Sequence, residues 1–158
     1  SMDFGPVLLN KRHNRENNGG TIRKTSETFQ LATAVLFQTP VQSFGITPNN
    51  LHEFPDFVID FMKEVPTVWD ETVFIDGYPG KYVVLARRQG DTWYIAGINA
   101  EKNTKDVVVS LPMLSGNQAV HYWDDAKLNP NQGSLKINNN KTVKLTLQSN
   151  GAVIIVGK

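Results

Sequence analysis

The side chains that could carry out acid–base chemistry occur as two adjacent acidic pairs, Asp70-Glu71 and Asp124-Asp125. Hydrolysis of a glycoside needs two carboxyl groups held on opposite sides of the bond that breaks. Neighbouring residues on a strand point to opposite faces of a sheet, and the second pair sits where a strand runs into a loop. We therefore interpret both pairs as turn or surface residues, in preference to catalysis or calcium binding.

Other residues with useful chemistry lack the partners that a site requires. His13, His52 and His121 have neither a second histidine four residues away nor a carboxylate at metal-ligand spacing, and the chain contains no cysteine. The glycines form no phosphate-binding loop, and no serine lies in a G-x-S-x-G nucleophile elbow. These residues therefore predict no catalytic and no metal-binding site within the chain.

Seven tryptophan and tyrosine residues offer another possibility, because an aromatic face can stack on the apolar face of a sugar ring. The alternative is ordinary burial, and the alternation along one strand favours it. Trp93 and Ile95 share one face of that strand, while Tyr94 and Ile98 share the other. We expect one face to lie inside the protein and the other to lie under the N-terminal half. The seven residues are Trp69, Tyr78, Tyr82, Trp93, Tyr94, Tyr122 and Trp123.

The composition is that of a compact protein without a strong electrostatic field. The 158 residues are 40% hydrophobic and 20% charged, with a formal net charge of +1. This balance argues against binding to nucleic acid or to an acidic membrane surface. The basic segment at residues 11–24 is interpreted as an exposed loop, since no aromatic residue is interleaved with its charges.

Membrane insertion is not expected. No apolar run approaches the roughly 20 residues that a membrane span needs. The first residues, SMDFGPVLL, also lack the basic start and the long apolar stretch of a signal peptide. Composition alone leaves the compartment open, because a chain without cysteine suits the cytosol, the periplasm or the exterior.

The elements that must position these residues divide the chain into two unlike parts. From Glu71 onward the apolar residues alternate with a period of two, and Gly90-Asp91 joins two such runs as a tight hairpin turn. Further turn signals, such as Asp76-Gly77 and Asn150-Gly151, come at the spacing of an antiparallel sandwich. We predict strands at residues 72–75, 81–88, 92–99, 106–111, 119–123, 134–137, 142–147 and 152–156.

The first part predicts two helices. One follows a capping residue, Thr25 or Ser26, and is apolar nearly all round over residues 27–38. The other is opened by a proline and buries a single stripe over residues 54–65. A short strand is expected between them, at residues 41–46.

A helix that is apolar all round needs packing partners on more than one side. We therefore expect Leu31, Val35, Leu36 and Phe37 to be covered by the sandwich or by another copy of the chain, or else to stay mobile. Self-association is the outcome that we favour.

Several stretches resemble a known enzyme family. Residues 65–103, VPTVWDETVFIDGYPGKYVVLARRQGDTWYIAGINAEKN, closely resemble the junction and C-terminal β domain of glycoside hydrolase family 97, the bacterial α-glucosidases and α-galactosidases. The preceding MDFGPVLL and LATAVLFQTPVQSF resemble the last portion of that family's (β/α)8 catalytic barrel. The resemblance covers essentially the whole chain, and its most specific pieces are WDET, ARRQGDTWYIAGIN and MDFGP.

The resemblance implies an α+β, mainly β chain in two parts. Residues 1–70 are expected to be the C-terminal remnant of the barrel, with two helices and short strands. Residues 71–158 are expected to form an antiparallel β-sandwich of about eight strands. A closed barrel takes about 250 residues, so the family's acid/base, nucleophile or base, and calcium-binding residues are expected upstream of Ser1. The chain alone is therefore expected to be inactive, while its parent hydrolyses α-glycosidic bonds.

The resemblance also implies partners, a cofactor and a location. The chain is expected to pack on the catalytic barrel of the parent and to support oligomerisation. Asp3 and Phe4 are expected to border the substrate pocket of the intact enzyme. Calcium is expected in the parent rather than in this chain, and the parent in the periplasm or at the cell envelope.

Two functional alternatives stay open. The first is an independent carbohydrate-binding module that uses surface aromatic residues, and the second is a complete small enzyme. The choices between glucoside and galactoside, and between inversion and retention, also stay open because they depend on residues outside the chain.

Overall fold

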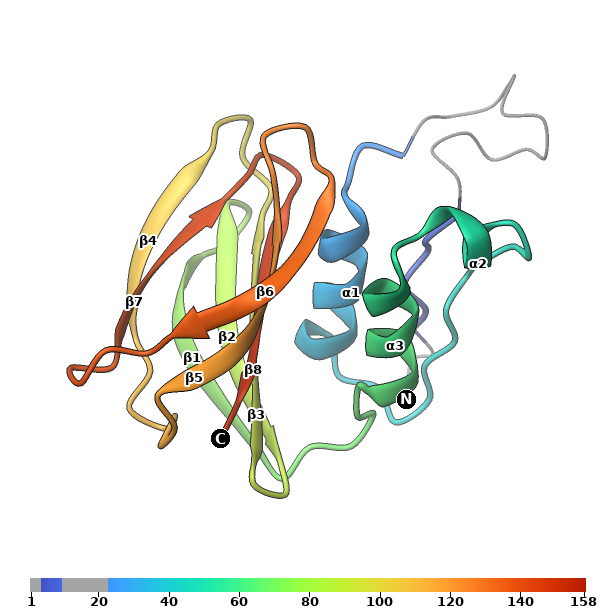
Figure 1. The fold of residues 1–158 in the computed structure, drawn as a ribbon. Coiled ribbons are helices and arrows are strands. Elements are labelled where there is room, and N and C mark those ends of the chain that lie inside the picture. Colours follow the sequence, from blue (N-terminus) through green and yellow to red (C-terminus); the bar gives the residue numbers. More distant parts are fainter. Residues whose placement is uncertain (1–3, 10–22) are drawn as a thin grey trace.

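A computed structural model of the chain describes residues 4–9 and 23–158. Its helices come before its strands in the sequence, as predicted (Figure 1). The helices are α1 (Glu27–Leu36), α2 (Asn50–Glu53) and α3 (Asp56–Glu64). The strands are β1 (Glu71–Tyr78), β2 (Tyr82–Gln89), β3 (Thr92–Asn99), β4 (Lys105–Ser110), β5 (Gln118–Asp124), β6 (Pro130–Lys136), β7 (Thr142–Leu147) and β8 (Ala152–Gly157).

The strands form two antiparallel sheets that pack as a sandwich. Six strands make one sheet in the order β1-β2-β3-β8-β5-β6, and β4 pairs with β7 in a second sheet. Figure 1 shows the β4–β7 sheet on one side of the six-stranded sheet and the helices on the other. The predicted mainly β, antiparallel sandwich is confirmed, with a layer of helices on its outer face.

The strand boundaries follow the predictions closely where alternation is strong. Residues 92–99 and 142–147 are strands with the predicted bounds. The largest difference is β6, which begins at Pro130, four residues before the predicted start at residue 134. β6 is an edge strand, where a proline can stand first without breaking a ladder, and residues 130–133 show no alternation.

The β2–β3 hairpin has the two-residue turn that the sequence predicts. Gln89 pairs with Thr92, which leaves Gly90 and Asp91 as the turn. Gly90 has a φ of 59°, whereas Asp91 does not have a positive φ. A positive φ at the first turn position alone is the requirement of a type II′ turn, and glycine meets it without steric cost.

The register of this hairpin sends alternate side chains into two separate apolar clusters. Trp93 and Ile95 pack in the cluster between the two sheets. Tyr94 and Ile98 pack in the cluster between the six-stranded sheet and the helices. Both faces are therefore used as predicted. The central strand β8 contributes to both clusters, and four consecutive residues, 152–155, are buried.

α1 lies against β3, β8 and β5 on one side and against α3 on another. The helix begins after Ser26, whose Oγ accepts a hydrogen bond from Phe29 N at 2.8 Å. Leu31, Val35 and Leu36 are buried in the cluster between helices and sheet. Cover by the sandwich is thus the alternative that the structure shows for this helix, while Phe37 remains 47% exposed.

The segments before and after α1 run side by side. Phe4 bridges Gln42, and Val7 bridges Gly45, both in parallel orientation. These isolated bridges replace the full strand predicted at residues 41–46. Two parallel segments joined through a helix have the arrangement of a βαβ unit.

Two further predictions concern the N-terminal part. α2 was not predicted, because a four-residue helix is too short to show a period. The basic loop predicted at residues 11–24 lies almost wholly outside the described residues. Within the described ranges, no helix is long and apolar enough to cross a membrane.

Candidate functional site

The C-terminal end of α1 is contacted by a buried arginine of the sheet. Arg87 of β2 donates hydrogen bonds from Nη2 to Leu36 O at 3.2 Å and from Nη1 to Phe37 O at 3.4 Å. Arg87 is only 4% exposed, and its guanidinium lies 5.9 Å from the centre of the Trp69 ring. Burial lowers the pKa of Arg87 from its ordinary value. The positive charge meets the unpaired carbonyls at the end of the helix, where a cation is favoured.

The N-terminal end of α1 is contacted by a buried carboxyl group. Asp124 of β5 accepts hydrogen bonds through Oδ2 from Ser26 Oγ at 2.5 Å and from Ala152 N at 2.8 Å. Burial raises the pKa of Asp124 to about 6, while hydrogen bonds to Ser26, Thr28 and Ala152 oppose the rise. The interpretation of Asp124 as a surface residue is therefore wrong, because the start of α1 covers it and leaves it 2% exposed.

These two contacts join the helix to the sheet with matched polarity. A helix carries partial positive charge at its N-terminus and partial negative charge at its C-terminus. The carboxyl group of Asp124 lies at the first end and the guanidinium of Arg87 at the second. We call Ser26, Leu36, Arg87 and Asp124, with the apolar cluster between them, the helix–sheet joint. Its chemistry is that of attachment, since Arg87 Nη1 and Nη2 and Asp124 Oδ2 are hydrogen-bonded at the two ends of the helix, while Arg87 Nε and Asp124 Oδ1 are buried without a hydrogen-bond partner among the described residues.

Aromatic rings complete the joint under α3. Tyr122 of β5 lies between two phenylalanines of that helix, with ring centres 6.1 Å from Phe57 and 5.2 Å from Phe61. Trp69, in the connection to β1, packs edge-on against Tyr94 at 5.3 Å. Such pairs add stability beyond the apolar area that they bury.

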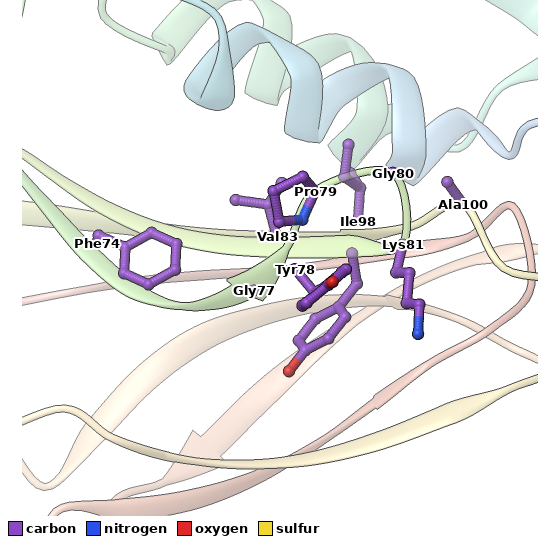
Figure 2. A pocket seen from close by; sticks show the side chains of 10 residues that line it. Phe74, Gly77, Tyr78, Pro79, Gly80, Lys81, Val83, Ile98 and Ala100 are labelled. Atoms are coloured by element: carbon purple, nitrogen blue, oxygen red, sulfur yellow. The ribbon is translucent and has the colours of Figure 1, made fainter.

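An apolar hollow of about 390 Å³ lies beside the joint, at the turn between β1 and β2. Figure 2 shows Pro79, Val83 and Ile98 below α1, with the ring of Phe74 to one side. Phe74 is 64% exposed. The remaining lining residues are Gly77, Tyr78, Gly80, Lys81, Tyr82 and Ala100.

Glycine 77 gives the hollow its shape. A Cβ atom there would lie 2.8 Å from Tyr82 O and 3.0 Å from Val83 Cα, too close to fit unless the backbone shifts. The next strand therefore runs directly beside the backbone of Gly77. The floor of the hollow at this point is main chain.

Of the two residues predicted to border a substrate pocket, the structure describes only Phe4. Asp3 lies outside the described residues. Phe4 is half-buried and packs edge-on against Phe37, with ring centres 4.7 Å apart. Its neighbours in the structure are the parallel segment at Gln42 and the end of α1.

The acidic pairs Asp70-Glu71 and Asp124-Asp125, which the structure describes, do not converge on a catalytic or metal site. Asp70 and Glu71 are exposed, which agrees with their interpretation as surface residues. Both form ion pairs with Arg88, from Asp70 Oδ2 to Nη1 at 3.5 Å and from Glu71 Oε2 to Nε at 3.2 Å. Asp125 accepts hydrogen bonds from the backbone of Lys127 and Asn129 and shapes a turn. Among the described residues, no group of three or more histidine or acidic side chains could hold a metal ion.

Most of the aromatic residues considered as sugar platforms belong to the core. Trp93 and Tyr122 are buried, and Trp123 stacks against His121 at 4.8 Å. Tyr78 is the exposed member, at 61%, with Lys81 Nζ 4.9 Å from its ring centre. A single exposed ring does not make a stacking surface for a sugar chain.

Comparison of sequences places the sandwich in a described family. Residues 68–156, more than half of the chain, match the sequence model of the family described as glycosyl-hydrolase 97 C-terminal, oligomerisation. The chain is 40% identical over 92 residues to a retaining alpha-galactosidase of Bacteroides thetaiotaomicron. It is 33% identical over 97 residues to a probable retaining alpha-galactosidase of Streptomyces bingchenggensis. The matches take in 58% and 61% of this chain but only 13% and 14% of those relatives.

Comparison of structures extends the likeness to the helices. A crystal structure of a beta-arabinopyranosidase matches 99% of this chain and 25% of its own, with a TM-score of 0.93 and 54% identity. A glycoside hydrolase family 97 enzyme from Pseudoalteromonas sp. strain K8, in complex with acarbose, matches 87% of this chain and 23% of its own. Its TM-score is 0.74 at 24% identity, which supports the fold alone.

Proposed function

This chain belongs to glycoside hydrolase family 97, and we propose that it is the non-catalytic C-terminal region of a longer enzyme, packing on the catalytic barrel and supporting oligomerisation. The observation that carries the proposal is the helix–sheet joint. Arg87 and Asp124 use buried hydrogen bonds to fix the two ends of α1 to the sandwich.

In this proposal residues 1–70 are the end of the barrel and residues 71–158 are the sandwich domain. The parallel bridges from Phe4 to Gln42 and from Val7 to Gly45, with α1 between them, support it. A barrel repeats this strand–helix–strand unit. α1 and α3 are then outer helices of the barrel, and the joint fixes their position relative to the sandwich.

The parent enzyme, in our proposal, hydrolyses glycosides of galactose or of the related pentose arabinose. Similarity to alpha-galactosidases and to a beta-arabinopyranosidase supports this over a glucoside substrate. Arabinopyranose lacks the exocyclic carbon of galactopyranose, so related pockets can serve both sugars. Asp3 and Phe4 stay assigned to the border of that pocket.

Two further expectations stay with the parent. Calcium is proposed for the parent enzyme, on the resemblance to the family. A periplasmic or cell-envelope location is likewise proposed for the parent, on the resemblance to the family.

An activity assay tests the proposal directly. The purified chain is incubated with nitrophenyl α-galactoside, α-glucoside and β-arabinopyranoside, with a full-length beta-arabinopyranosidase as positive control. We expect release of nitrophenol only in the control, because acid–base hydrolysis needs two opposed carboxyl groups. Hydrolysis by the chain itself, retained through repurification, would overturn the non-catalytic assignment.

A further inference from the structure

We propose that the apolar hollow beside the β1–β2 turn is the surface on which a second copy of this chain docks. The inference rests on the oligomerisation role proposed above and assigns that role to a surface. It commits to a contact between copies in which β1 of each copy faces β1 of the other.

The exposed apolar side chains of the sandwich gather at β1. Within residues 68–156, three of the five exposed large hydrophobic residues are Val68, Phe74 and Tyr78, with exposures of 65%, 64% and 61%. Phe74 and Tyr78 both line the hollow. A cluster of exposed apolar residues around a cavity is typical of a protein-binding surface.

The position of β1 at the end of the sheet adds a second reason. β1 pairs with β2 on one side, and no described strand pairs with its other side. An edge strand presents backbone groups that can pair with another chain, unless its sequence prevents this. A register shift between Phe74 and Asp76 interrupts the edge, so regular pairing is confined to residues 71–74. Phe74 lies in this regular part, and pairing there across a two-fold axis would also cover the side of the hollow that Phe74 forms.

The exposed face of the β4–β7 sheet fits a second copy less well. On the β4–β7 sheet Val108 is 67% exposed, but polar residues surround it. Lys144 Nζ lies 2.7 Å from Asp106 Oδ2, and Thr146 donates to Asp106 Oδ1 at 2.8 Å. These groups already satisfy one another, so burying this face would gain little apolar area.

The experiment compares matched variants of the whole chain by sedimentation velocity over a range of concentrations. Phe74→Asp places a charge in the hollow, and Val108→Asp places the same charge on an equally exposed strand of the other sheet. We expect the wild type to form dimers and Phe74→Asp to weaken the dimer at least about tenfold. Val108→Asp should associate as the wild type does.

A second measurement keeps the result independent of any folding defect at Phe74. The chain has no cysteine, so a single Thr72→Cys or Val108→Cys can carry a pyrene label. Thr72 precedes Phe74 by two positions on the same face of β1. We expect excimer fluorescence between copies labelled at position 72 and none at position 108.

The outcomes separate this inference from the function on which it rests. A wild type that associates, with Phe74→Asp unchanged and no excimer at position 72, would overturn the assignment to the hollow and leave the oligomerisation role intact. A wild type that stays monomeric at every concentration would overturn both for this chain.

Discussion

Replacing Asp124 by asparagine should change how the stability of the protein depends on pH. Asparagine has the same shape, and its carbonyl oxygen can accept the hydrogen bonds that Ser26 Oγ and Ala152 N donate to Oδ2. It removes only the ionisation of a buried group. The difference in stability between wild type and variant therefore isolates the titration of Asp124.

The magnitude follows from the pKa of that carboxyl group. Burial raises the pKa of Asp124 from 3.8 to about 6. Between these values the native protein binds more protons than the unfolded chain, so the free energy of unfolding falls as the pH rises. The stabilisation is complete below pH 3.8 and is lost as the pH rises through about 6. At about 1.4 kcal/mol per pKa unit, the whole change is about 3 kcal/mol.

Urea unfolding at several pH values, followed by tryptophan fluorescence, measures this change. Relative to wild type, Asp124→Asn should gain about 2 kcal/mol in its free energy of unfolding between pH 4 and pH 7, since a part of the whole change already lies below pH 4. Asp125→Asn is the matched control, because hydrogen bonds from the Asn129 side chain and backbone lower the pKa of Asp125. Relative to wild type, the free energy of unfolding of Asp125→Asn should therefore fall as the pH rises. If the free energy of unfolding of Asp124→Asn minus that of wild type stays constant or falls as the pH rises, the pKa of Asp124 is not raised by burial.

Two further variants test the helix–sheet joint by urea unfolding at neutral pH. Arg87→Met should cost about 1–3 kcal/mol, because the carbonyls of Leu36 and Phe37 lose their donors. A cost equal to that of Arg88→Met, which breaks exposed ion pairs, an exposed hydrogen bond to Gly90 O and a contact with the Trp93 ring, would contradict this. Leu31→Ala should cost about 2–5 kcal/mol through the cavity that it leaves in α1. Leu51→Ala is the control, because Leu51 is 49% exposed, and it should change the free energy of unfolding by less than about 0.5 kcal/mol. Equal costs for Leu31→Ala and Leu51→Ala would mean that α1 is not packed on the sheet.

Local pattern was enough to predict the elements and the faces of the strands. Gly90 identified the hairpin because only a small set of residues tolerates its turn, and alternation then assigned Trp93 and Tyr94 to opposite faces. Ser26 was one of two candidate caps because hydroxyl residues satisfy the free amides of a first turn.

The partners of α1 could not be predicted, because they depend on the order of strands in the sheet. The helix lies across β3, β8 and β5, which are distant in sequence. Without that order, the sequence left open whether the sandwich or another copy of the chain covers this helix, and self-association was the favoured alternative. The division of the strands into sheets of six and two also cannot be predicted from local sequence patterns.

The joint itself was missed for a related reason. Alternation shows that Asp124 and Asp125 point to opposite faces, but not that a helix end covers one of these faces. For Arg87 a signal was present, since it follows Val83 and Leu85 on the face that packs under the helices. A charge on an apolar face indicates a buried partner, and here the partners are helix carbonyls.

The placement of β8 bears on how such a chain can be made in the cell. The centre of the large sheet is occupied by the segment that the ribosome delivers after every other strand described here. Until β8 has been synthesised, no described strand joins β1-β2-β3 to β5-β6, and the inner edges of β3 and β5 have no partner among these strands. Those edges are exposed to wrong pairing during synthesis. The two halves of the large sheet can therefore be joined only after the last of the described strands has been made.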